Sequence, residues 1–143
     1  IYCVVLVIAN AGRIFVMVLN ARTALQRSQK DTQRKNDLSR AQTALSSYQS
    51  SNRNGLPADD KWDTFATNYL KAGGDTFSDP ARGDYTFVVV DDLAIPPTYD
   101  ETTAQINITR KATCQGEDLR PAGGSKVAFR MKLEGGGIAC VNN

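Results

Sequence analysis

The feature that most constrains this chain is its N-terminal segment, IYCVVLVIANAGRIFVMVLNARTAL. Seventeen of the first 21 residues are apolar, against 41% of the whole 143-residue chain. A helix of about 20 apolar residues is long enough to cross the hydrocarbon core of a membrane. No basic segment or initiator methionine comes before the apolar run, and no small-residue cleavage site follows it. A secretory signal peptide is therefore not expected.

Three polar residues interrupt this segment: Asn10, Arg13 and Asn20. On scales of membrane insertion, a charge at the centre of the bilayer costs about 2.5–3.5 kcal/mol. Two interpretations remain open. The segment is either a single-pass anchor that tolerates a few polar side chains, or a helix that leaves lipid and packs against copies of itself, where these side chains find partners.

The residues after the apolar segment predict that the helix continues. Residues 26–37 contain no hydrophobic residue, but they also lack glycine and proline. Asp31 and Lys35 are spaced for a weak i,i+4 ion pair, and stop signals come only at residues 52–57, NRNGLP. A helix over residues 1–52 is about 78 Å long at 1.5 Å per residue, so its first half projects beyond any domain of this size.

The second half of this helix has the pattern of a helix that docks on a sheet. Apolar side chains recur there at intervals of three, four and three residues, as expected for one buried face. These side chains are Leu38, Ala41, Leu45 and Tyr48. The basic stretch before them favours a solvated face or a contact between chains. A nucleic-acid patch is the alternative, but no aromatic residues alternate with the basic ones.

The remaining residues predict a small head domain. Residues 58–70 are typical of a short amphipathic helix. Alternating or β-branched runs predict strands at residues 85–90, 105–111, 126–133 and 138–141. The expected fold is α+β, with the second half of the long helix packed on a roughly four-stranded antiparallel sheet. The expected parts are residues 1–25, a transmembrane or filament-core half-helix; residues 26–53, the amphipathic half; and residues 54–143, the head.

Charge is segregated along the chain, although the net charge is only +2. Residues 1–53 hold eight Lys/Arg and two Asp/Glu (+6), residues 54–109 three and ten (−7), and residues 110–143 six and three (+3). The acidic residues of the predicted loops match no EF-hand spacing, so we expect solvated loops rather than a calcium site. These residues are Asp75, Asp79, Asp84, Asp91, Asp92, Asp100 and Glu101.

The sequence gives little support to enzyme chemistry. It has no histidine, nucleophile elbow, phosphate-binding glycine loop or metal-ligand spacing, so we expect no catalytic residue, no metal and no cofactor. Cys3 lies alone in the apolar segment, whereas Cys114 and Cys140 lie on strands that could meet. A disulfide between them would enclose 25 residues, contribute about 3.5 kcal/mol and imply an oxidising compartment. Two buried free thiols are the alternative.

Three stretches of the chain resemble the type IV pilins, especially bacterial major pilins with long N-terminal helices. VVLVIANAG and IFVMV resemble the membrane and assembly segment of that family. ALQRSQKDTQRKNDLSRAQTALSSYQSSNRNGLP resembles its basic, Asp-containing helix with a tyrosine-bearing turn and a Gly/Pro exit. KLEGGGIACVNN resembles its final strand, where a cysteine closes a disulfide-bounded loop. The resemblance covers nearly the whole chain, although the middle loops match only in general layout.

Three features depart from the family pattern. Cys3 stands where the family has a glutamate that pairs with the terminal amine of the neighbouring subunit, and the family's mature N-terminal phenylalanine would lie before Ile1. Thr23 stands near the family's helix-breaking proline. Polar residues also replace apolar ones at Asn10, Arg13, Asn20 and Arg22. The resemblance therefore extends to a helix-core role and not to that salt bridge.

The resemblance implies a structural subunit. In that family a prepilin peptidase cuts the leader, the new N-terminus is methylated, and subunits wait in the cytoplasmic membrane. An ATPase-driven machine with an inner-membrane platform then extrudes them into a helical homopolymer at the cell surface, used for adhesion, twitching motility or DNA uptake. Surface or host-cell ligands are possible further partners. The assembly helix would use Val4, Val5, Leu6, Val7, Ile8, Ile14, Phe15, Val16, Met17, Val18 and Leu19.

Two other functions remain as alternatives. A pseudopilin of a type II secretion or competence apparatus forms a short periplasmic piston and often uses calcium rather than a disulfide in its C-terminal region, so the pair Cys114 and Cys140 favours the pilin. A membrane-anchored binding domain that never polymerises would also have an apolar N-terminal helix. The uninterrupted run from that helix into the basic stretch argues weakly against such a domain.

Overall fold

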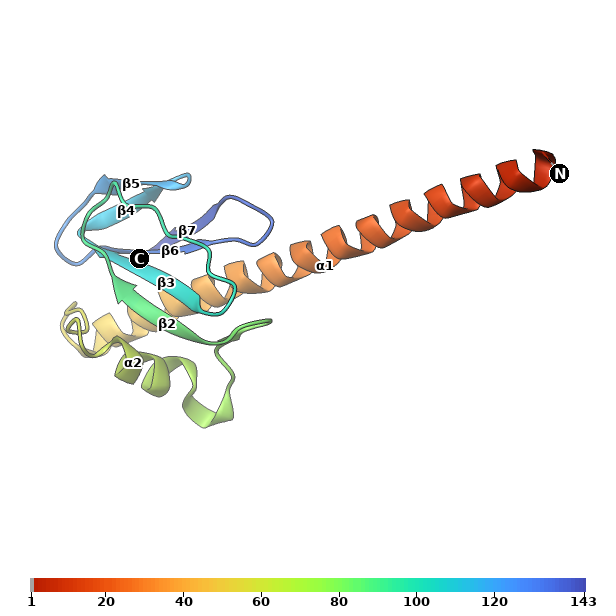
Figure 1. Ribbon diagram of the computed structural model, residues 1–143. Helices are drawn as coiled ribbons and strands as arrows, with labels where there is room; N and C mark the ends of the chain where they lie inside the picture. The colour runs from red at the N-terminus through yellow and green to blue at the C-terminus, as the bar shows by residue number, and fades with distance from the viewer. Residues whose placement is uncertain (1) are drawn as a thin grey trace.

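The computed structural model describes residues 2–143 as one long helix with a head at its C-terminal end (Figure 1). Helix α1 (Tyr2–Ser51) is continuous over 50 residues, or about 75 Å at 1.5 Å per residue. Ile1, where the predicted helix begins, lies outside the described residues. The predicted end is confirmed, since Arg53 and Asn54 have φ of 54° and 62°, and this left-handed backbone cannot continue the helix.

The short helix of the head begins later than predicted. Residues 58–61 form a turn instead, closed by the hydrogen bond from Lys61 N to Ala58 O. Helix α2 (Trp62–Phe65) then runs directly into a π-helical turn, η1 (Ala66–Leu70), and a short 3₁₀ turn, η2 (Ala72–Gly74), follows. Trp62 and Phe65 are buried, as expected for the apolar face of a short amphipathic helix.

The sheet is mixed, and this corrects the prediction of a roughly four-stranded antiparallel sheet. Five strands lie in the order β1-β2-β3-β6-β7, and β2 and β3 are parallel while the other neighbours are antiparallel. The strands are β1 (Ser78–Asp79), β2 (Gly83–Val89), β3 (Ala104–Arg110), β6 (Val127–Lys132) and β7 (Ile138–Asn142). The parallel pair is possible because residues 90–103 form a connection long enough to return the chain to the same end of the sheet.

The structure also contains a second, two-stranded sheet that was not predicted from the sequence. Strands β4 (Ala112–Gln115) and β5 (Asp118–Pro121) form an antiparallel hairpin whose turn contains Gly116 with φ of 65°. Lys111, also in the left-handed region with φ of 53°, separates β3 from β4. Two runs of four residues are too short to show a period, so the sequence pattern did not reveal them. The α+β class is nevertheless confirmed.

The core lies between the second half of α1, helix α2 and one face of the five-stranded sheet. The predicted stripe on α1 lies in it: Leu38, Ala41 and Leu45 are fully buried, and Tyr48 packs against the cluster with its ring edge-on to Phe65. The sheet contributes Ile106, Ile108, Val127, Phe129 and Met131. Only the second half of α1 is used in this way, so its first half extends away from the head (Figure 1).

Candidate assembly surface and the charge network at its base

The first half of α1 makes no buried contact with the rest of the described chain. Every residue from Cys3 to Gln29 is exposed, over a helix length of about 40 Å. Its large apolar side chains are between 46% (Leu19) and 68% (Val7) exposed. Leu25 lies on this surface too. All the predicted assembly residues also lie on it, namely Val4, Val5, Leu6, Val7, Ile8, Ile14, Phe15, Val16, Met17, Val18 and Leu19.

This apolar surface is too large to remain in water. Soluble monomers rarely expose contiguous apolar patches above a few hundred Å², and burying one such side chain stabilises by about 1.5–3 kcal/mol. For the dozen large apolar side chains at their observed exposure, burial is favourable by on the order of 10–20 kcal/mol. By length and composition α1 could cross a membrane, so it is weakly compatible with membrane anchoring.

The polar residues of this half of α1 are not spread evenly around it. At 100° per residue, Asn10, Arg13 and Asn20 lie within an arc of about 80°, and Arg22 lies on the opposite side. The small residues Ala9 and Gly12 leave a shallow depression beside Arg13. One side of the helix therefore combines hydrogen-bonding groups with room for another chain to approach.

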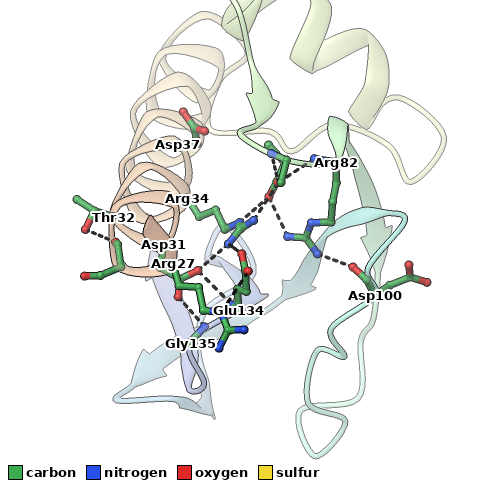
Figure 2. A network of polar contacts seen from close by, with 12 residues as sticks. Arg27, Asp31, Thr32, Arg34, Asp37, Arg82, Asp100, Glu134 and Gly135 are labelled. Atoms are coloured by element: carbon green, nitrogen blue, oxygen red, sulfur yellow. Dashed lines mark hydrogen bonds and ion pairs between the residues drawn. The ribbon is translucent and has the colours of Figure 1, made fainter. Parts of the chain in front are cut away.

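A network of buried charges lies where α1 meets the head (Figure 2). Arg34 is fully buried and donates two hydrogen bonds to Asp79, from Nε to Oδ2 (2.6 Å) and from Nη2 to Oδ1 (3.1 Å). Its Nη1 donates to Asp31 Oδ1 (2.7 Å) and to Glu134 Oε2 (3.2 Å). The charge network comprises Asp31, Arg34, Asp79, Arg82 and Glu134.

Asp79 connects α1 to strand β1. Its carboxylate also accepts hydrogen bonds from Arg82 Nη2 (2.8 Å) and from the backbone N–H groups of Ala81 and Arg82. Burial alone would raise the pKa of this carboxyl, but the hydrogen bonds from Arg34 and Arg82 outweigh it and hold the pKa far below its usual range. Burial likewise opposes the charge of Arg34, yet its carboxylate partners raise the pKa of the guanidinium above normal. Asp79 and Arg34 are therefore both charged at neutral pH.

Asp31 connects α1 to the turn between β6 and β7. Its carboxylate accepts hydrogen bonds from the backbone N–H groups of Glu134 (3.1 Å) and Gly135 (2.8 Å). Burial would raise the pKa of Asp31, but these bonds and Arg34 lower it overall. The turn needs glycine here, because a Cβ on Gly135 would lie 2.9 Å from Asp31 Oδ2.

A second buried carboxylate on α1 continues these polar contacts toward the core. Tyr85 donates its hydroxyl to Asp37 Oδ2 at 2.8 Å, and Arg40 Nη1 lies 3.4 Å from Asp37 Oδ1. Burial raises the pKa of the Tyr85 phenol, and the neighbouring Asp37 charge raises it further. Together with the charge network, this contact fixes the direction in which α1 leaves the head.

The sequence interpretation of residues 26–37 as a solvated or interchain face is wrong for three of them. Asp31, Arg34 and Asp37 are buried, and Asp31 pairs with Arg34 rather than with the expected Lys35, which is exposed. Asp79, expected in a solvated loop, is only 4% exposed. The sequence did indicate that Asp31 and Arg34 are buried, because positions 31 and 34 continue the docking stripe of residues 38, 41 and 45 at the same spacing.

The disulfide considered for Cys114 and Cys140 is present, with their Cα atoms 5.9 Å apart, and it joins the β4–β5 hairpin to strand β7. Cys3 is a free, exposed cysteine. Among residues 2–143, no three His, Cys, Asp or Glu side chains are grouped as they would be to hold a metal ion. The charged side chains described above bind one another and serve to position α1.

Protein-family models, curated protein sequences and solved structures all give no match to this chain. The arrangement itself, a long apolar N-terminal helix over a sheet that carries a disulfide, fits the shape expected from the resemblance to type IV pilins. The shape defines an α+β protein whose long N-terminal helix is exposed over residues 3–29.

Proposed function

We propose that this chain is the structural subunit of an extracellular filament of the type IV pilin class. One observation carries the proposal: about 40 Å of helix from Cys3 to Gln29 is exposed, and its large apolar side chains have no partner in the described part of the chain. A surface of this size calls for either lipid or other helices. In the proposal it meets both, lipid before assembly and the same helix of other copies afterwards.

The driving force for assembly is an exchange of lipid contacts for helix–helix contacts. Lipid tails are as apolar as leucine, so burial of Val4–Leu19 alone gives little preference for the filament. The preference comes from close packing and from polar groups that lipid cannot satisfy. Asn10, Arg13 and Asn20 are such groups, since a charge at the bilayer centre costs about 2.5–3.5 kcal/mol and all three side chains are exposed on one side of α1.

The charge network gives the head a fixed position on this helix. Arg34 binds Asp79 of β1 and Glu134 of the β6–β7 turn simultaneously. An ordered filament requires each head to leave the core at the same angle, and the bidentate, fully buried pair of Arg34 with Asp79 provides such geometry. The disulfide between Cys114 and Cys140 stabilises the head in an oxidising, extracytoplasmic environment.

The proposal is tested by comparing the full chain with a truncation that begins at Arg27, each expressed with a pilus assembly machinery. The full chain is expected to give thin filaments in electron micrographs and to sediment at high speed. The truncation keeps the charge network and the head but lacks the apolar surface, and is expected to remain dispersed. Filaments from the truncation, or dispersed full chain with an active machinery, would contradict the proposal.

The same comparison separates the alternatives. A membrane-anchored binding domain predicts that the full chain stays monomeric in the membrane and that the truncation keeps its binding function. A pseudopilin predicts short fibres with calcium-dependent stability and free thiols at Cys114 and Cys140. The observed disulfide favours the pilin over the pseudopilin. The proposed filament would act in adhesion, twitching motility or DNA uptake.

A further inference from the structure

The face of the five-stranded sheet that points away from α1 carries a buried arginine, Arg130. Phe129 and Met131 point into the core, so Arg130, between them on β6, points to the opposite face. This residue is only 2% exposed. Its Nη2 donates a hydrogen bond to the carbonyl oxygen of Ile95 (2.6 Å), but its Nε is buried without a partner in the described chain. Arg34 is equally buried, yet it binds three carboxylates.

Arg130 also lacks a close counter-charge. No carboxylate of the described residues lies within ion-pair distance of its guanidinium. Asp118, at the start of β5, acts on it from further away and is exposed, so that water screens the attraction. Burial therefore lowers the pKa of Arg130, and the charge of Asp118 offsets only part of this effect. A charge taken out of water without a partner costs free energy, so other interactions must hold the segments that cover Arg130.

The β4–β5 hairpin forms part of this cover. Strand β4 packs against β6 and β7 on the side of the sheet away from α1 (Figure 1). The cross-strand partner of Arg130 on β7 is Cys140, so these two side chains are neighbours on that face. Cys140 is bonded to Cys114 of β4. The disulfide therefore fixes the hairpin beside the unpaired guanidinium.

Few other contacts hold the hairpin on the sheet. Among the residues of β4 and β5 only Ala112 is buried, and an alanine side chain contributes little apolar surface. Cys114 N donates a hydrogen bond to Asn142 Oδ1 of β7 (3.0 Å), and Ala122 N donates to the carbonyl oxygen of Lys111 (2.7 Å). Segments with so few buried apolar contacts open at a low free-energy cost. The disulfide is thus the main link between the hairpin and the sheet.

We propose that the β4–β5 hairpin is a redox-controlled cover for Arg130, closed while Cys114 and Cys140 are bonded and open after their reduction. The reductant is a dithiol. Its two sulfurs form a new disulfide, and its two electrons and two protons convert Cys114 and Cys140 to thiols. With this link broken, hydration of the guanidinium outweighs the few contacts that remain. The open form exposes a cation that the closed form hides. The inference concerns the head alone and does not depend on whether the chain forms a filament.

The first test is amide hydrogen exchange of the full chain in a non-ionic detergent, with and without dithiothreitol. Cys3→Ser is the background, so that no other disulfide forms. An isolated two-stranded hairpin is marginally stable. Reduction is therefore expected to speed exchange in residues 112–121 by about tenfold or more, while β3 and β6 keep their protection.

Two substitutions separate the charge of Arg130 from the shape of its side chain. Arg130→Met removes the charge and keeps a similar length, so its hairpin is expected to stay closed on reduction, with exchange changed by less than about threefold. Arg130→Lys keeps the charge and is expected to open as the wild type does. Lys132→Met, on the same face of β6 but partly exposed, is the matched control and is also expected to open.

A second measurement reports on the guanidinium directly and needs no substitution of Arg130. Phenylglyoxal modifies accessible arginine side chains, and mass spectrometry of peptides locates the modified residues. Arg130 is expected to react about tenfold faster, or more, in Cys114→Ser/Cys140→Ser than in the disulfide-bonded chain. Arg34, which is fully buried by the charge network, is the internal control and is expected to stay unreactive in both.

Four results would overturn the proposal. Exchange in residues 112–121 that ignores dithiothreitol would show that other contacts hold the hairpin. An Arg130→Met hairpin that opens as fully as the wild type would show that the buried charge has no part in opening. Loss of protection throughout the head, together with a change in Trp62 fluorescence, would show that the disulfide is needed for the whole fold. Arg130 that stays unreactive in Cys114→Ser/Cys140→Ser would show that the hairpin does not cover it. None of these results bears on filament formation.

Discussion

Arg34→Leu is the most informative perturbation of the charge network. The wild-type side chain is fully buried and donates four hydrogen bonds to three carboxylates, two to Asp79 and one each to Asp31 and Glu134. Removing the guanidinium leaves buried carboxylates with Arg82 as the remaining cation beside Asp79. Breaking a buried ion pair by removing one partner costs about 3–5 kcal/mol. We expect the free energy of unfolding to fall by that amount at neutral pH.

The pH dependence of this loss has a definite sign. In the wild type, the pKa values of Asp79 and Asp31 are lower in the folded than in the unfolded chain. Their contribution is therefore complete above the unfolded pKa of about 3.9 and is lost as pH falls through the folded values. In Arg34→Leu, burial without this cation raises the pKa of the same carboxyls, and protonation relieves the unpaired charge. The stability difference between wild type and variant is thus expected to shrink as pH falls from neutral to about 4.

The assay uses the full chain in a non-ionic detergent. Trp62 is the single tryptophan and is 2% exposed, so its fluorescence reports unfolding of the head during a urea titration. Lys35→Leu is the matched control, because Lys35 lies one residue further along α1 and is exposed; its expected effect is below about 0.5 kcal/mol. A loss below about 1 kcal/mol for Arg34→Leu, or a loss that does not change with pH, would refute the reasoning.

The same titration tests three smaller changes. Gly135→Ala places a Cβ 2.9 Å from Asp31 Oδ2 and should cost about 1–3 kcal/mol, whereas Gly123→Ala, with nothing within 4 Å, should be nearly neutral; equal effects would argue against the steric account. Cys114→Ser/Cys140→Ser should cost about 2–4 kcal/mol while Cys3→Ser costs nothing, and the reverse order would contradict the structural role of the disulfide. Tyr85→Phe leaves the buried Asp37 without one hydrogen bond and should cost about 1–3 kcal/mol; no loss would show that Arg40 alone satisfies this carboxylate.

The helices were more predictable than the sheet, for physical reasons. The long helix follows from local sequence: the absence of proline, the three- and four-residue spacing at Leu38, Ala41 and Leu45, and the stop at residues 52–57. The parallel pairing of β2 with β3 depends on the path of residues 90–103, which no local pattern records. No local pattern predicts β1 either, because this strand is only two residues long.

The charge network was harder to predict from the sequence than the helices were. Charged residues are rarely buried unless they are paired, so a charged position on a docking stripe is ordinarily assigned to solvent. The partners of Arg34 come from residues 45 and 100 positions later in the chain, Asp79 and Glu134. Only the fold brings them together. By contrast, the exposed apolar surface of α1 was expected from composition, because nothing in the head is long enough to cover it.

A helical reconstruction of the fibre formed by the wild-type chain would show whether the exposed half of α1 forms the core of a filament. We expect residues 4–25 of α1 to lie in the fibre core against the same segment of neighbouring copies, with the heads outside. We also expect Arg34 to remain bound to Asp79 in every head. Fibres in which these helices face solvent or lipid, or wild-type chain that remains as dispersed particles in the presence of an active assembly machinery, would contradict these expectations.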